Sequence, residues 1–186
     1  MNILLFNGSH RVNGNTSKLS KSFLDIAVEM GHTVYSLDSI ESCIHCSVCT
    51  RGLQCPLKDN FEDLEIPIYS LDAVVVASPL YFFSISPKAL SFLTRLYPYS
   101  LDHITFGLIL ASGSDFSDSG VDIVVDQFKS IDSYCGSTTV YPYHKVTYDK
   151  VWEVSDLDTE GLKQLLTRIE SAVKAKEDYR ENQKTR

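Results

Sequence analysis

Four cysteines stand close together in the first third of the chain. They follow the spacing C-x2-C-x2-C-x5-C, and a proline comes directly after the last one. The four residues are Cys43, Cys46, Cys49 and Cys55. Bacterial ferredoxin sequences place thiolates at similar intervals and use them to ligate [4Fe–4S] clusters. The spacing therefore favours an iron–sulfur cluster within the long segment 39–60.

Two other interpretations of the cysteine run stay open. Structural zinc sites usually take two separated pairs of ligands, so zinc is less favoured here than a cluster. A reactive dithiol could instead exchange electrons without any metal. The fifth cysteine, Cys135, stands alone near the end of a predicted helix, where it is expected to be a small packed residue and not a ligand.

A second chemical signal lies over residues 7–15, between a predicted strand and a predicted helix. Glycines such as Gly14 let a ligand approach the backbone. A helix N-terminus offers unpaired N–H groups and a partial positive charge, and Arg11 can add a charge-assisted hydrogen bond. The loop therefore predicts an anion site suited to phosphate. The alternative is a tight turn before a capped helix, since Asn13-Gly14 is a common turn pair.

Two further loops carry residues that suit a flat ring. The first, 78–87, holds three consecutive aromatic residues, Tyr81, Phe82 and Phe83, that could form an apolar wall. A hydrophobic turn under a helix, or half of a dimer contact, would explain the same residues. The second, 111–115, has small residues that allow close approach to a ring edge, although an ordinary polar loop before a helix explains them equally well.

The elements that must position these loops alternate along the chain. Short apolar runs predict strands at 3–6, 33–37, 72–77, 106–111 and 138–141. Longer amphipathic runs predict helices at 16–30, 87–96, 118–131 and 162–173. Leu90, Leu93 and Leu96 are expected on the inner face of the second helix. This alternation predicts an α/β domain over 1–177 with a doubly wound parallel sheet and three layers, αβα. The polar tail 178–186 is expected to fray.

Charge and hydropathy exclude several classes of function. The formal net charge is −7, and there is no basic patch before the last dozen residues, which argues against a nucleic-acid partner. No apolar run approaches the length that spans a bilayer, and the first residues do not resemble a signal peptide. A cytoplasmic location and no membrane partner are the expectation.

The segment 8–19 resembles the opening of the NAD(P)H-dependent FMN reductases, Gly-Ser-Pro-Arg-x-x-Gly-Asn-Thr-x-x-Leu, with His10 in place of the proline. With the cysteine run, the chain is similar to the iron–sulfur flavoprotein branch of that family over roughly residues 2–175. The resemblance implies a flavodoxin-like sheet of five strands in the order 2-1-3-4-5. It also implies that Ser9, Arg11, Gly14, Asn15, Thr16 and Ser17 hold the FMN phosphate, and that Pro79, Leu80, Tyr81, Phe82, Ser112 and Gly113 lie by the ring.

The same resemblance implies an oxidoreductase in which NAD(P)H is the co-substrate. Electrons would pass through FMN, and through a [4Fe–4S] cluster if one is held by the cysteines, to a quinone, flavin or protein acceptor. No catalytic side chain is predicted, because the cofactor carries the chemistry. A homodimer or homotetramer is implied as well. A non-enzymatic electron carrier and a zinc-stabilised interaction module remain as alternatives.

Overall fold

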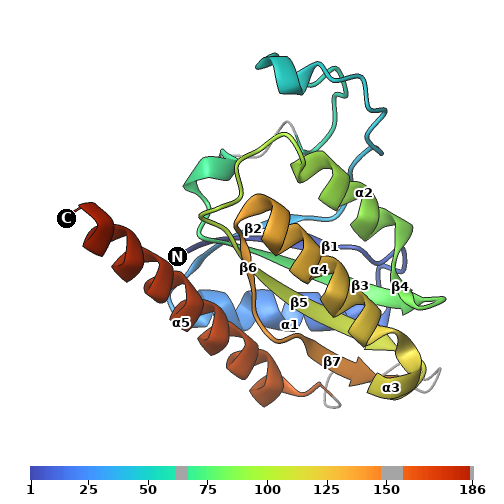
Figure 1. Cartoon of the computed structure of the whole chain (residues 1–186). Helices are drawn as coiled ribbons and strands as arrows, with labels where there is room; N and C mark the ends of the chain where they lie inside the picture. The colour runs from blue at the N-terminus through green and yellow to red at the C-terminus, as the bar shows by residue number, and fades with distance from the viewer. Residues whose placement is uncertain (62–66, 148–156, 185–186) are drawn as a thin grey trace.

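The computed structural model describes residues 1–61, 67–147 and 157–184, and it shows a twisted sheet covered by helices on both faces (Figure 1). Four parallel strands form its centre in the order β2-β1-β3-β5. They are β1 (Asn2–Asn7), β2 (Thr33–Leu37), β3 (Ala73–Tyr81) and β5 (Thr105–Ser112). This arrangement confirms the predicted doubly wound, flavodoxin-like class.

The predicted fifth strand at 138–141 is shortened to two residues in the structure, and a further short strand follows beyond the predicted range. β6 (Thr138–Thr139) and β7 (Tyr143–Val146) both pair parallel with β5, at different heights along it. Pro142 lies between the two pieces, and a proline has no N–H to donate to a ladder. The sheet therefore keeps the predicted order with its last position split, and a short β4 (Ser84–Ile85) is added antiparallel to β3.

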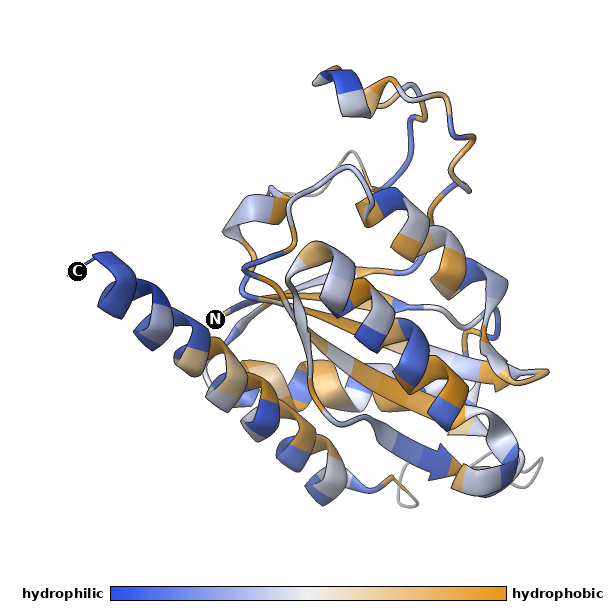
Figure 2. Cartoon of the chain, viewed as in Figure 1, coloured by the Kyte–Doolittle hydropathy of each residue, from blue (hydrophilic) through white to orange (hydrophobic). Residues whose placement is uncertain are grey.

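Each face of the sheet is covered by its own pair of helices. α1 (Asn15–Glu29) and α5 (Thr159–Lys184) pack on one face, and α2 (Pro87–Leu96) and α4 (Val121–Cys135) lie on the other (Figure 1). Figure 2 shows β5, in the middle of the sheet, as mostly hydrophobic, whereas β7 at its edge is hydrophilic. Alternate residues of β3 enter the two cores, with Val74 on the α2 side and Val75 on the α1 side, because side chains alternate along a strand.

The inner face of α2 differs from the prediction. Leu96 is buried as expected, but Leu90 is exposed, and the other buried side chains are those of Ala89, Phe92 and Arg95. The phase of the helix is set by Phe92, whose ring stacks on Phe6 of β1 at 4.2 Å between centroids. A leucine spacing of three drifts around a helix of 3.6 residues per turn, so the three leucines do not share one side.

The remaining helices follow their apolar patterns more closely. The predicted helix 118–131 is a short α3 (Phe116–Ser119) and then α4, separated by Gly120 with a φ of 82°. Where the sequence predicts a frayed tail, α5 continues to Lys184, because residues 178–184 include good helix formers. In the described part of the chain, no helix is long and apolar enough to cross a membrane.

Candidate functional site

The loop after β1 is closed by its own hydrogen bonds. The Asn7 side-chain amide donates to Ser17 Oγ at 3.0 Å, and Ser17 Oγ donates to the Arg11 carbonyl at 2.8 Å. Ser9 Oγ accepts from the Arg11 amide at 3.1 Å. Gly14 is the N-cap of α1, and no acidic side chain stands in the first turn to offset the positive end of that helix. The loop is thus held by its own side chains at the positive end of α1.

Helix α2 supports this loop from behind. Ser86 caps α2 by accepting from the Ala89 amide, and its hydroxyl donates to the Gly8 carbonyl at 2.7 Å. Lys88 Nζ donates to the Ser9 carbonyl at 2.9 Å. Burial lowers the pKa of Lys88, and Asp38 acts in the opposite direction. Gly8 is required here, since a Cβ at this position would lie 2.8 Å from the Ala89 Cβ.

A cleft of about 340 Å³ opens where β1, β3 and β5 end. Its walls come from the three loops that the sequence indicates, together with Thr147. The lining residues are Ser9, Arg11, Gly14, Asn15, Thr16, Pro79, Leu80, Tyr81, Ala111, Ser112, Gly113 and Thr147. The carboxyl ends of parallel strands are where ligands bind in such sheets. The structure therefore brings together every predicted cofactor-contacting residue except Ser17 and Phe82.

Those two residues lie outside the cleft wall for different reasons. Ser17 is buried behind the loop, where its hydroxyl holds Arg11 in place. Phe82 is 96% exposed at the tip of the turn between β3 and β4. Phe82 and Phe83 both have positive φ, 50° and 66°, as a two-residue type I′ turn requires. Of the three consecutive aromatics, only Tyr81 lines the cleft.

Sequence reasoning missed two residues that fix the far wall of the cleft. Thr147 donates from its amide and its hydroxyl to the Ser112 carbonyl, at 2.7 and 2.9 Å. His144 Nε2 lies 2.7 Å from Ser112 Oγ. Because the single Ser112 hydroxyl proton goes to the Ser114 carbonyl at 2.7 Å, His144 must donate from Nε2. Ser112 is therefore held by contacts from β7 and from Thr147 just after it, and no motif in the sequence predicts these contacts.

The four predicted metal ligands line one small cavity of about 30 Å³. Cys46 is exposed and the other three thiols are half-buried; all are free. Four soft thiolates around a common space are a suitable donor set for an iron–sulfur cluster. In the described ranges, no group of three or more His, Cys, Asp or Glu side chains is already arranged to hold a metal ion.

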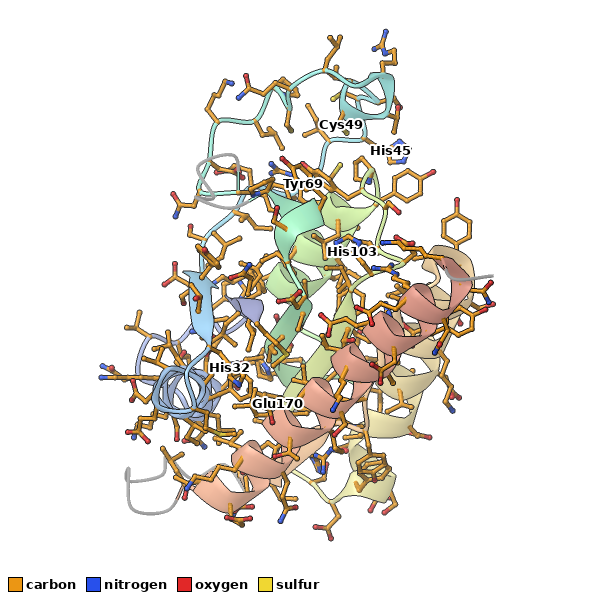
Figure 3. All side chains as sticks on the ribbon, turned by 90° about the vertical axis from the view of Figure 1, so that its left-hand side faces the viewer. His32, His45, Cys49, Tyr69, His103 and Glu170 are labelled. Carbon is orange, nitrogen blue, oxygen red and sulfur yellow. The ribbon has the colours of Figure 1, made fainter. Side chains whose placement is uncertain are left out.

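The cysteine loop stands apart from the sheet. It contains only a 3₁₀ turn, η1 (Cys49–Arg51), and projects beyond α2 in Figure 1. Figure 3 places Cys49 and His45 at this end of the molecule, away from the contact of His32 Nε2 with Glu170 Oε1 at 3.0 Å. His45 and Ser47 have positive φ, 53° and 58°, so the loop bends sharply on both sides of Cys46.

The family model for NADPH-dependent FMN reductases matches residues 1–148. The chain belongs to this family. An iron–sulfur flavoprotein of Archaeoglobus fulgidus is 30% identical over 96 residues, which cover 50% of this chain and 44% of that protein. One of Methanocaldococcus jannaschii is 26% identical over 102 residues, 53% of each. The chain thus spans about half the length of the curated relatives that it matches.

Solved structures of flavodoxins, azoreductases and RosB share this fold. RosB, solved with a bound 8-demethyl-8-formylriboflavin-5′-phosphate intermediate, superposes with a TM-score of 0.69 at 12% identity. The match covers 96% of this chain and 81% of RosB. At that identity the likeness establishes the fold alone.

Proposed function

We propose that this reductase-family chain binds FMN in the cleft and passes electrons from NAD(P)H to a second acceptor. The observation that carries the proposal is the cleft itself. An anion site on β1–α1 and an apolar wall on β3 lie on one cavity, as a molecule with a phosphate at one end and a flat ring at the other requires. Family membership supports the same cofactor.

Each part of the cleft has a task in this proposal. Ser9, Arg11, Asn15 and Thr16, with the close backbone of Gly14, hold the phosphate. Pro79, Leu80 and Tyr81 support the ring, and Ser112 and Gly113 lie at its edge. FMN, when bound, supplies the hydride and electron chemistry. The chain contributes binding, orientation and exclusion of water, so we assign no side chain as acid or base.

We further propose that Cys43, Cys46, Cys49 and Cys55 ligate a [4Fe–4S] cluster. Their shared cavity supports this assignment, as do the iron–sulfur relatives. Zinc and metal-free redox thiols are the competing interpretations of these cysteines.

We propose that the electron acceptor is a quinone, a flavin or a protein. Phe82 and Phe83, exposed in the turn between β3 and β4, support a homodimer or homotetramer, and a cytoplasmic location accords with free thiols.

The first experiment is anaerobic purification followed by a visible spectrum and analysis of flavin, iron and sulfide. We expect one FMN and four irons per chain, and oxidation of NADPH or NADH in the presence of a quinone. Flavin without turnover of either nicotinamide would favour an electron carrier. A colourless protein that FMN cannot reconstitute would eliminate both functions and leave the zinc module.

Two sets of variants separate the cofactors. Replacing the four cysteines by serine should remove all iron and leave FMN bound; iron retained after those changes would defeat the cluster proposal. Arg11→Met should weaken FMN binding roughly 10- to 100-fold, because a charge-assisted hydrogen bond contributes about 1.5–3 kcal/mol. Lys21→Met, on the exposed side of α1, is the matched control and should bind FMN normally.

A further inference from the structure

A buried ion pair joins the cysteine loop to α2. Arg95 Nη1 donates to Asp59 Oδ2 at 2.8 Å, and Arg95 Nη2 donates to Asp59 Oδ1 at 3.3 Å. The side chains are only 3% and 9% exposed. Arg95 comes from the last turn of α2, whereas Asp59 follows the last cysteine by four residues. This geometry is bidentate, which fixes orientation as well as distance.

The same pair closes the loop on itself. Asp59 Oδ2 also accepts from the Glu41 amide at 2.6 Å, and Arg95 Nη1 also donates to the Glu41 carbonyl at 3.2 Å. Glu41 lies just before the first cysteine, so the two ends of the segment 41–59 meet at one point. A second contact, Ser42 Oγ to Ser91 Oγ at 2.9 Å, ties the entering strand of the loop to α2.

Aromatic packing makes this point rigid. The Arg95 guanidinium lies 4.7 Å from the centroid of the Phe61 ring. Phe61 contacts Phe92 edge to face at 6.3 Å, and Phe92 stacks on Phe6 of the central strand. Burial opposes ionisation of Asp59, but hydrogen bonds from Arg95 and the Glu41 amide outweigh it and hold the pKa of this carboxyl below its usual value.

Helix α2 connects this point to the cofactor cleft. At its first turn, Ser86 and Lys88 donate hydrogen bonds to the carbonyls of Gly8 and Ser9. These carbonyls belong to the loop 7–15 after β1, the proposed phosphate loop. At its last turn, Arg95 holds the cysteine loop. The ten-residue helix spans about 15 Å. One rigid element therefore carries contacts to both segments proposed to hold redox groups.

We propose that Arg95 and Asp59 are positioning residues that hold together the two ends of the segment carrying the four cysteines, so that the thiols can gather around a metal at a fixed place relative to the phosphate loop. The inference rests on the proposed ligand role of the cysteines. Arg95 lines the same cavity as the four thiols, but its charge is paired with Asp59. The effect proposed for the pair is on the placement of the thiols.

Cobalt(II) is the probe, because a site with four thiolates gives it a characteristic tetrahedral spectrum. The full-length, iron-free protein is titrated as wild type, Arg95→Met, Arg95→Lys and Asp59→Asn. We expect Arg95→Met to weaken cobalt binding more than tenfold while FMN stays bound. Arg95→Lys keeps the positive charge but loses the bidentate guanidinium. Its cobalt affinity should lie between those of Arg95→Met and wild type. Lys129→Met is the control, since it removes an ion pair of the same 2.8 Å length from an exposed site on α4.

Alkylation of the iron-free thiols tests, independently of any metal, whether the Arg95–Asp59 ion pair positions the cysteine loop. Loss of the pair should speed labelling of the half-buried Cys43, Cys49 and Cys55 and leave the exposed Cys46 almost unchanged. If wild type gives no tetrathiolate spectrum, the metal-site proposal fails. The alkylation pattern still decides whether the Arg95–Asp59 pair positions the loop. A folded Arg95→Met or Asp59→Asn protein with wild-type cobalt affinity and labelling rates would overturn the inference. Should Arg95→Met not fold, Arg95→Lys and Asp59→Asn carry the same decision.

Discussion

The phosphate loop and the cysteine loop are both short segments that carry chemistry, but the fold positions them in different ways. The phosphate loop runs from a central strand directly into a helix, and its serine and asparagine side chains close it internally. The cysteine loop leaves the edge strand β2 and is held at its base by contacts to α2. Between those contacts it has one 3₁₀ turn and three residues in the left-handed region, His45, Ser47 and Gly52.

The difference shows what each site needs in order to form. The topology of the sheet places the phosphate loop, Pro79 and Ser112 around one cleft. The cysteines share a cavity, but their described arrangement is not yet a closed ligand set. Binding of a metal would therefore contribute to ordering this loop, as it does in other small metal sites. Substitutions in the two loops should accordingly affect different properties.

The largest effect should come from adding a side chain where the phosphate loop meets α2. In Gly8→Val, the new Cβ would lie 2.8 Å from the Ala89 Cβ and 3.0 Å from the Ala77 carbonyl. We expect FMN affinity to fall at least 100-fold and the free energy of unfolding to drop by about 1–3 kcal/mol, the usual cost of overpacking. Isothermal titration with FMN and urea denaturation measure the two quantities.

The matched substitution in the cysteine loop is Gly52→Val. Gly52 has a φ of 74°, and a Cβ there would meet no atom within 4 Å. It should cost about 1–2 kcal/mol of backbone strain and leave FMN affinity unchanged. An equal loss of FMN affinity in Gly8→Val and Gly52→Val would contradict this expectation. It would mean that the two loops are coupled by more than their shared contacts to α2.

A smaller effect should appear as a dependence of the free energy of unfolding on the protonation of His144, beside the far wall of the cleft. Burial lowers the pKa of His144, with Asp115 acting in the opposite direction. The unfolded chain therefore binds this proton more readily, so the stability that neutral His144 contributes is complete above about pH 6.5 and declines as the pH falls below it. In His144→Gln, the difference in unfolding free energy between about pH 7.5 and about pH 5.5 should shrink.

Comparison with wild type isolates His144 from the contacts of His32 and His103, which are unchanged. Alkylation rates of the four loop cysteines should be the same in both proteins at each pH. An identical pH dependence in His144→Gln would show that protonation of this residue is not linked to folding.

The sequence predicts these two regions unequally, for physical reasons. The alternation of strands and helices and the place of the cleft at the carboxyl ends of the strands follow from local patterns, whereas the strand order is implied by the family resemblance. The buried role of Arg95 was not predicted, because a leucine at every third position of α2 concealed the true inner face. Its partner Asp59 lies 36 residues away, and His144 lies 32 residues from Ser112. Contacts between such distant polar residues leave no periodic signal in one sequence.

The smallest effect should come from the turn between β3 and β4, whose Phe82 does not line the cleft. Phe82 is expected from the family resemblance to contact the ring, but it is almost fully exposed and adopts a φ of 50°. Phe82→Asn places a residue preferred in type I′ turns there and should raise the free energy of unfolding by up to about 1 kcal/mol. FMN affinity should stay within about twofold, whereas Tyr81→Ala, which alters the cleft wall, should weaken it several-fold more. A tenfold loss of FMN in Phe82→Asn would mean that the turn folds over the cleft when the cofactor binds, and that the cleft, like the cysteine loop, is completed by what it holds.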